Sequence, residues 1–177
     1  MNQSIVKTTT NQRGPQLLEF KSCGRQYACD LLWVKEVLRS PVVTSINLVA
    51  NYVRGVVHLR GQILTALNLE TRLGHMKEEF LPIDRCIVFK TANDIARLSR
   101  APDDSEMADS DPSGLLVDSI GDILPSGATV LPAPPEALSG LDTRFISGVI
   151  SGNEGLITVL RIGALLSMPE NRKNPAP

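Results

Sequence analysis

The amino-acid sequence predicts a mainly β fold of two small barrels, each with about five strands, and a few short helices. A stretch of 22 residues, Tyr52 to Leu73, returns without a gap as a matching pattern at Phe145 to Leu166. In both copies, β-branched or apolar runs flank a glycine-containing turn, which is typical of buried antiparallel strands. Further strand candidates bring each half of the chain to about five, and two small barrels accommodate such halves better than one sandwich.

The first element expected is a hairpin. Leu18 to Phe20 alternates apolar and charged residues, and an extended run resumes at Tyr27 to Leu31 after a glycine turn. Val34 to Arg39 is expected to form a short helix that stops before Pro41, because proline disfavours helical backbone in the residue before it.

Each copy of the repeat is expected to be a hairpin followed by one turn of helix. In the first copy, Asn68 can cap a helix over Leu69 to Leu73, and Gly74 can end it in the left-handed conformation. The expected strands are Val56 to Val57 and Ile63 to Leu67 in the first copy, and Gly148 to Ser151 and Leu156 to Leu160 in the second, whose helix runs through Leu166. The two copies differ in the turn, so specialised chemistry is expected there.

Between the copies lie strand candidates and an acidic segment. The strands are expected at Cys86 to Lys90, Leu115 to Asp118 and Ile120 to Leu124. The segment from about residue 92 to 113 has no hydrophobic period, and it carries six acids against two arginines. It is interpreted either as a solvated, mobile loop or as an acidic docking element.

Composition limits the classes of function. The chain has 177 residues, with 18 Lys and Arg against 19 Asp and Glu, so its net charge of −1 gives no general attraction to nucleic acid or anionic lipid. Without a signal-peptide core or a long apolar run, we expect a cytoplasmic protein that does not insert into the membrane. Residues 1–15 and 169–177 are polar and are expected to be flexible tails around one domain at 16–168.

The sequence offers no catalytic centre. The common nucleophile, zinc-protease and phosphate-loop motifs are missing, and neither histidine has a Cys or carboxylate at metal-ligand spacing. We therefore expect no catalytic residue, no metal and no cofactor. Cys23, Cys29 and Cys86 are interpreted as small buried residues rather than redox groups.

An oligonucleotide-binding barrel is an alternative on architecture alone. Such a site needs exposed aromatic side chains interleaved with basic residues. The aromatic residues here fall in apolar patterns and are interpreted as core, and the charge balance argues against nucleic acid.

Arg60 is the candidate binding residue at the tip of the first repeated hairpin. Its guanidinium can either pair with a carboxylate such as Glu36 or present five donors to a partner. An exposed turn arginine in an ion pair of about 0–1 kcal/mol is the alternative without function.

The stretch VRGVVHLRGQILTALNL, residues 53–69, resembles the signature of CheW-like domains, I-K-G-V-x-N-L-R-G-x-I-V-P-I-V-D-L. Leu18 to Phe20, Tyr27 to Asp30, Val34 to Val37 and Gly114 to Leu124 are similar to further elements of that family. The resemblance implies two intertwined five-stranded SH3-like barrels. It also implies an adaptor without catalysis that joins the cytoplasmic tips of methyl-accepting chemotaxis receptors to the regulatory domain of a CheA-type histidine kinase.

The resemblance also implies where a partner binds. The family's receptor contact is an apolar groove that takes a helical hairpin, and its matching positions here include Val34, Glu36, Gly55 and Arg60. His58 beside Arg60 replaces the family's asparagine, and the acidic insertion is unusually long. A divergent scaffold of a non-flagellar chemosensory pathway is therefore the main alternative, and self-association into rings is a further possibility that the family suggests.

Overall fold

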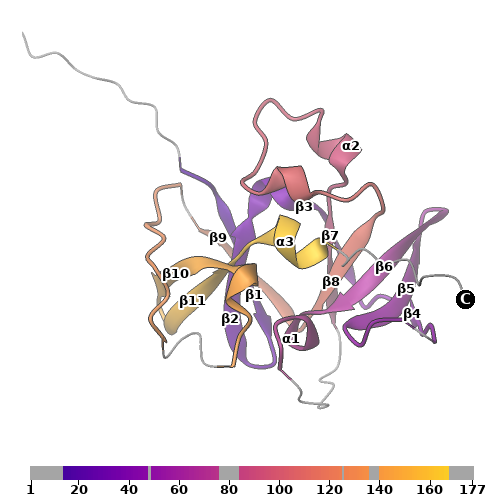
Figure 1. Ribbon diagram of the computed structural model, residues 1–177, viewed down its shortest axis with the longest axis horizontal. Helices are drawn as coiled ribbons and strands as arrows, with labels where there is room; N and C mark the ends of the chain where they lie inside the picture. Colours follow the sequence, from indigo (N-terminus) through magenta and orange to yellow (C-terminus); the bar gives the residue numbers. More distant parts are fainter. Residues whose placement is uncertain (1–13, 48, 76–83, 125, 136–139, 168–177) are drawn as a thin grey trace, which may run out of the picture.

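In the computed structural model, which describes residues 14–47, 49–75, 84–124, 126–135 and 140–167, two β lobes lie side by side with short helices between them (Figure 1). The predicted tails lie outside the described residues, apart from Gly14 and Pro15. No helix in the described part of the chain is long and apolar enough to cross a membrane.

Each lobe is built on one sheet. The first has the strand order β10-β11-β2-β1-β9, and the second has the order β3-β7-β8-β6-β5-β4. The strands of the first sheet are β1 (Leu17–Ser22), β2 (Arg25–Asp30), β9 (Ser119–Leu124), β10 (Ile146–Gly152) and β11 (Gly155–Leu160). Those of the second are β3 (Val34–Arg39), β4 (Val43–Thr44), β5 (Val53–Leu59), β6 (Gln62–Asn68), β7 (Arg85–Phe89) and β8 (Ser113–Val117). The predicted mainly β class with two sheets is confirmed.

The two sheets are intertwined through an exchange of hairpins. The N-terminal hairpin β1–β2 pairs with β9 and, in parallel, with β11 of the second repeat, while β7–β8 pairs with β3 and, again in parallel, with β6 of the first. Apart from the short edge strand β4, the two strand orders are equivalent. The strands β3, β7, β8, β6 and β5 of the second sheet correspond in order to β9, β1, β2, β11 and β10 of the first. The first and second halves of the chain therefore do not form one barrel each, as the strand count alone suggested.

The repeated unit folds as predicted in both copies. A hairpin leads into one helical turn, α1 (Leu69–Arg72) in the first copy and α3 (Ile162–Leu166) in the second. The Asn68 side chain accepts a hydrogen bond of 2.9 Å from the Thr71 amide, and Gly74 has a φ of 99° just after α1. The predicted cap and left-handed stop are both confirmed.

Matching positions of the repeat build matching parts of the core. Each lobe has its own apolar cluster, with Val57, Leu64 and Ala66 in one and their counterparts Ile150, Ile157 and Val159 in the other. A third, central cluster is shared by both lobes, and it contains four such pairs: Tyr52 with Phe145, Leu67 with Leu160, Leu69 with Ile162 and Leu73 with Leu166. The repeat therefore encodes both the lobes and the contact between them.

Val34 to Arg39 is a strand, β3, so the helix predicted there is wrong. β3 pairs antiparallel with β7, with a register shift between Val34 and Glu36. Its side chains alternate, with Val34, Glu36 and Leu38 half-buried and the residues between them exposed. The apolar spacing of Val34, Val37 and Leu38 looked helical because Val37, although apolar, faces outward.

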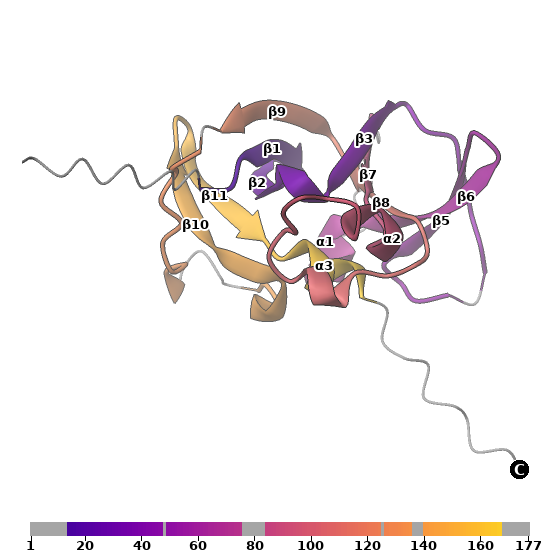
Figure 2. The same cartoon turned by 90° about the horizontal axis from the view of Figure 1, so that it is seen from above.

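The acidic segment predicted at about residues 92–113 falls in the β7–β8 connection, residues 90–112, hereafter the insertion, and this connection is only partly solvated. It contains α2 (Ala92–Ile95), with a capping box between Thr91 and Asp94, and the 3₁₀ turn η2 (Ser105–Met107). Viewed from above, it lies over α3 (Figure 2). Ile95 is buried in the central core, so the prediction of a wholly solvated loop is wrong.

The cysteines divide into two kinds. Cys29 and Cys86 are buried in the core as predicted, and burial raises the pKa of the Cys86 thiol to about 12. Cys23 instead lies exposed in the β1–β2 turn with a φ of 47°, which corrects the expectation that it is buried.

Candidate partner-binding site

The β5–β6 hairpin ends in a two-residue turn that presents Arg60. Leu59 pairs with Gln62 across the hairpin, and the two residues between them, Arg60 and Gly61, have φ values of 49° and 82°. Positive φ at both central residues is typical of a type I′ turn, which matches the twist of the flanking strands. Glycine adopts this backbone freely, whereas an arginine there costs about 1 kcal/mol. The backbone conformation of the turn therefore does not favour an arginine at position 60.

Glu36 reaches the same place from the opposite edge of the sheet. The alternation of β3 points Glu36 to the side of Val34 and Leu38, and Leu38 packs against the apolar cluster of this lobe. Leu59 packs against the same cluster from the end of β5. The curvature of the sheet therefore brings β3 and the β5–β6 turn together.

Arg60 and Glu36 form an ion pair across this closure. The distance from Arg60 Nη2 to Glu36 Oε2 is 3.2 Å, with the Arg60 side chain 80% exposed and the Glu36 side chain 25% exposed. A pair so open to water contributes about 1 kcal/mol or less to folding. The two side chains line a small cavity of about 110 Å³ whose walls include Leu59, Leu64 and Val88. A guanidinium that is mostly free to water beside an apolar recess suits recognition more than stability.

Lys35 and the insertion flank the Arg60–Glu36 pair. The sequence did not predict these two neighbours. The Lys35 ammonium donates to Asp94 at 2.9 Å, and Pro112 at the end of the insertion also lines the cavity. This contact holds the pKa of Asp94 below its ordinary value, chiefly through the hydrogen bond from Lys35. The capping box T-x-x-D at Thr91 to Asp94 was the available sequence signal for an ordered segment here.

Val34, His58 and Gly55 have different surroundings. Val34 is half-buried against the central core, and its carbonyl oxygen accepts from Lys90 Nζ. His58 is exposed and pairs in register with Ile63, whose side chain is 57% exposed, on the outer face of the hairpin. His58 also lines a separate shallow hollow with Leu38 and Val42.

Gly55 does not reach the Arg60–Glu36 pair. It is buried, has a φ of 147°, and a Cβ there would lie 2.1 Å from the Thr44 carbonyl oxygen. Gly148, its counterpart in the second repeat, faces the Leu131 carbonyl oxygen in the same way, at 2.4 Å. Both glycines allow a neighbouring backbone to approach the first strand of a hairpin. The close approach of the Thr44 backbone therefore accounts for a glycine at position 55 without a partner contact.

The corresponding turn of the second repeat carries the opposite charge. β10 and β11 are joined by Asn153 and Glu154, and Glu154 accepts from Lys21 on β1 at 2.8 Å. Both groups are exposed, at 68% for Glu154 and 42% for Lys21. The two hairpins thus share their strand pairing but differ at their tips, in charge and in turn conformation, because Arg60 and Gly61 have positive φ and Asn153 and Glu154 do not.

A polar network that is buried at Tyr27 and Glu70 and exposed at Arg25 joins β2 to α1 and to His75. The Tyr27 hydroxyl donates to Glu70 at 3.0 Å, and Arg25 Nη1 lies 2.5 Å from His75 Nε2. Burial raises the pKa of Glu70, against the effect of the hydrogen bond from Tyr27. Burial also raises the pKa of Tyr27 above its ordinary range. Each partner is satisfied within the fold, so this network is a structural feature.

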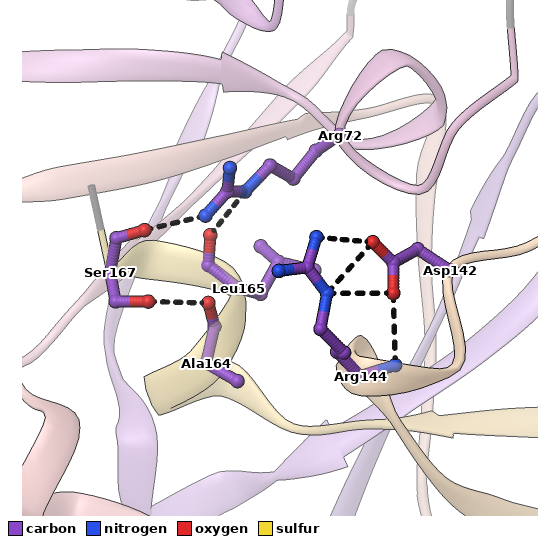
Figure 3. Close-up of polar contacts among 6 residues, drawn as sticks. All are labelled: Arg72, Asp142, Arg144, Ala164, Leu165 and Ser167. Carbon is purple, nitrogen blue, oxygen red and sulfur yellow. Dashed lines mark hydrogen bonds and ion pairs between the residues drawn. The ribbon is translucent and has the colours of Figure 1, made fainter. Parts of the chain in front are cut away.

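Arg72 fastens the two copies of the repeat together (Figure 3). From the end of α1, its Nε donates to the Leu165 carbonyl oxygen at 2.9 Å and its Nη2 to that of Ser167 at 2.5 Å, at the C-terminal end of α3. A cation at this end of a helix is favoured by the partial negative charge of the unpaired carbonyls. Burial lowers the pKa of Arg72. Sequence reasoning missed this residue because its partners are backbone atoms far along the chain.

The described residues contain no group of three or more His, Cys, Asp or Glu side chains that could hold a metal ion. The candidate site instead combines a carboxylate, an exposed guanidinium and apolar walls. Such a surface can bind a protein helix through charge-assisted hydrogen bonds and apolar contacts.

The chain matches the family model described as "CheW-like domain" over residues 16–170. It is 26% identical to the "Probable chemotaxis protein CheW" of Rhizobium etli over 168 residues, covering 95% of this chain and 97% of that protein. It is 25% identical to the "Chemotaxis protein CheW" of Treponema pallidum, covering 95% of this chain and 91% of the relative. The crystal structure of scaffolding protein TtCheW from Thermoanaerobacter tengcongensis aligns with a TM-score of 0.66 at 21% identity, covering 88% of this chain and 94% of that one.

Proposed function

This chain belongs to the family of CheW-like domains, a family of non-catalytic chemotaxis scaffolds, and from that premise we propose that it couples chemoreceptors to a CheA-type histidine kinase. The proposed partners are the cytoplasmic tip of a methyl-accepting receptor and the regulatory domain of the kinase. The protein would work in the cytoplasm, recruited to receptors at the membrane.

The observation that carries the proposal is the Arg60–Glu36 pair. Arg60 is 80% exposed, sits in a strained turn position and lies at the mouth of an apolar recess. A residue kept there at a conformational cost, for an ion pair of little stabilising value, is better explained by a contact outside the chain. We assign this face to the receptor tip, with Val34 and His58 at its margins.

The mechanism needs no bond chemistry. If one signalling state of the receptor binds this face more tightly than another, the difference in binding free energy shifts the equilibrium of the attached kinase. The scaffold has only to hold both partners at once, on separate surfaces. A rigid pair of lobes with a shared core suits that task.

A divergent scaffold of another chemosensory pathway is the second candidate. The observation that favours it is the insertion of residues 90–112 beside Lys35, which reshapes the neighbourhood of the proposed receptor face. The oligonucleotide-binding alternative loses its support, because the six aromatic side chains in the described part of the chain are buried.

Binding assays with purified proteins test the proposal. A chemoreceptor and a CheA-type kinase from the same organism serve as partners, and each partner is titrated separately with the full chain. We expect binding to the receptor tip and to the kinase regulatory domain at once, with neither displacing the other. Failure to bind either protein, or competition between them for one surface, would contradict a coupling role.

A further inference from the structure

The insertion is more than the fold needs. Two residues, Cys23 and Gly24, join β1 to β2, whereas residues 90–112 join the equivalent strands β7 and β8. The β1–β2 hairpin shows that a tight turn suffices at this place in a lobe, so the fold does not require the longer connection between β7 and β8. Its contacts with the rest of the molecule indicate what it does instead.

The insertion is fastened along its length to three other elements, the 3₁₀ turn η1 (Leu31–Trp33), α3 and β3. Trp33 Nε1 donates to the Asp103 carbonyl oxygen at 3.2 Å, and the Ala164 amide in α3 donates to Asp104 Oδ2 at 3.2 Å. At its start, the Asp94 carboxylate holds Lys35 on β3. These anchors hold residues 103–107 as a wall opposite the first lobe.

A groove of about 820 Å³ runs between this wall and the first lobe. Its lining is apolar over a large part, contributed by Leu17, Trp33, Met107, Val130, Val159 and Leu160. Met107 is 41% exposed, so apolar surface remains open to a partner. The volume is that of a ligand-sized cleft rather than a packing defect.

The charges along the groove are unbalanced. Four carboxylates line it, from Asp30, Asp103, Asp104 and Glu106, against Arg144 and Arg161. The Arg144 guanidinium is already engaged by Asp142 at 2.5 Å, as Figure 3 shows. Burial raises the pKa of both Asp30 and Asp104, so water does not fully solvate these carboxylates. A cationic side chain entering the groove would restore the solvation they lack.

We propose that this groove is a second docking surface, which takes a protein segment with an apolar side and Lys or Arg residues along its edge. The acidic wall repels phosphate, so neither nucleic acid nor an anionic membrane fits it. The proposal goes beyond the coupling function, because the groove and the Arg60 face are lined by different residues.

A labelled peptide allows a direct test, because Trp33, the only tryptophan of the chain, lines the groove but is buried and is therefore a poor reporter of binding. The probe is the amphipathic peptide KLLKLLKKLLKLLK, which has no aromatic residue, and its matched control replaces each Lys by Glu. We expect the fluorescence anisotropy of the basic peptide, labelled at its N-terminus, to rise saturably as the protein is added, and that of the labelled acidic peptide to stay unchanged. No change with the basic peptide, or an equal change with both, overturns the proposal.

Variants locate the binding. Asp103→Asn with Glu106→Gln changes two exposed side chains of the wall, and we expect affinity for the basic peptide to fall roughly 3- to 10-fold. Asp111→Asn with Asp122→Asn removes the same charge outside the groove and should change affinity less than twofold. Equal losses in both pairs would mean nonspecific attraction and would also overturn the proposal. Arg60→Glu should leave peptide binding unchanged, which separates this test from that of the coupling function.

Discussion

Tyr52 and Phe145, at matching positions of the two repeats, both lie against the guanidinium of Arg72. The Arg72 Cζ atom is 4.2 Å from the centroid of the Tyr52 ring and 4.7 Å from that of Phe145. The same guanidinium donates to two carbonyl oxygens at the end of α3. One side chain thus links the equivalent ends of both repeats to the central core.

Arg72→Met should therefore destabilise the whole fold. The variant keeps most of the apolar stem but loses two charge-assisted hydrogen bonds and both ring contacts, so we expect the free energy of unfolding to fall by roughly 2–4 kcal/mol. Arg72→Lys keeps the charge but lacks the planar guanidinium, so its free energy of unfolding should lie between those of the parent and Arg72→Met. Urea denaturation measures all three proteins. An unchanged midpoint for Arg72→Met would show that the contacts of Arg72 contribute nothing to stability.

The Arg60–Glu36 pair can be tested by reversing its charges. Arg60→Glu should weaken receptor binding at least roughly tenfold while changing the free energy of unfolding by about 1 kcal/mol or less, as expected for a surface position. The double variant Glu36→Arg with Arg60→Glu restores an ion pair within the chain but presents the opposite charge to a partner. Binding should stay lost in it.

Arg60→Asn is the matched control for the turn. Asparagine tolerates positive φ better than arginine, so this variant should be at least as stable as the parent while lacking the guanidinium. If Arg60→Asn binds the receptor as the parent does, or the charge-swapped pair recovers binding, Arg60 is only a structural ion-pair partner.

Gly55 and Gly148 should both resist substitution by alanine, and at Gly55 the φ of 147° adds backbone strain. An alanine at either position places Cβ within 2.4 Å or less of a backbone oxygen, which cannot move aside as a side chain does. We expect each substitution to cost about 3 kcal/mol. Gly61→Ala is the control, because Gly61 has a φ of 82° but open space around it, and it should cost about 1 kcal/mol. Similar losses in all three variants would contradict the symmetric backbone approach, and thermal unfolding distinguishes the outcomes.

Glu70 gives a prediction for pH. Burial raises its pKa in the folded protein above the ordinary value of 4.5, so the folded state holds its proton more tightly than the unfolded chain. The favourable contribution of protonated Glu70 is therefore complete below pH 4.5 and is lost as pH rises through the raised pKa.

Glu70→Gln removes this dependence and keeps an acceptor for the Tyr27 hydroxyl. The stability of Glu70→Gln relative to the parent should rise with pH above 4.5 and then level off. Taking the difference between two proteins cancels carboxyls such as Asp94 and Asp142, whose pKa values are lowered and whose effects have the opposite sign. A difference that stays flat or falls with pH would contradict the assignment.

Local sequence signals predicted the repeated hairpins and their helices well. Paired apolar runs around a glycine turn, and an asparagine at the start of α1, act within a few residues of where they occur. The exchange of hairpins was not foreseeable from such signals. The parallel pairings of β6 with β8 and of β11 with β2 join segments that are distant in the sequence. The residues of a single strand do not predict which strand it pairs with.

β3 shows why the site was harder to predict than the fold. Its half-buried Glu36 and exposed Val37 invert the usual alternation of a strand, so the segment carried no clear strand signal and was predicted as a helix. The inversion is linked to the site itself, because Glu36 faces inward to meet Arg60. The family resemblance supplied Arg60 and Glu36 as a pair, and the structure brings the two into contact, whereas Lys35 and Pro112 became visible only through the folded insertion.

The most direct test of the coupling role is a sedimentation assay. Vesicles that carry the receptor are spun down with the kinase, in the presence and absence of this protein. We predict that the kinase enters the pellet only when the protein is added, and that Arg60→Glu abolishes this while the kinase still binds the soluble variant. Recovery of the kinase to the same extent without the protein, or none with it, would contradict the account.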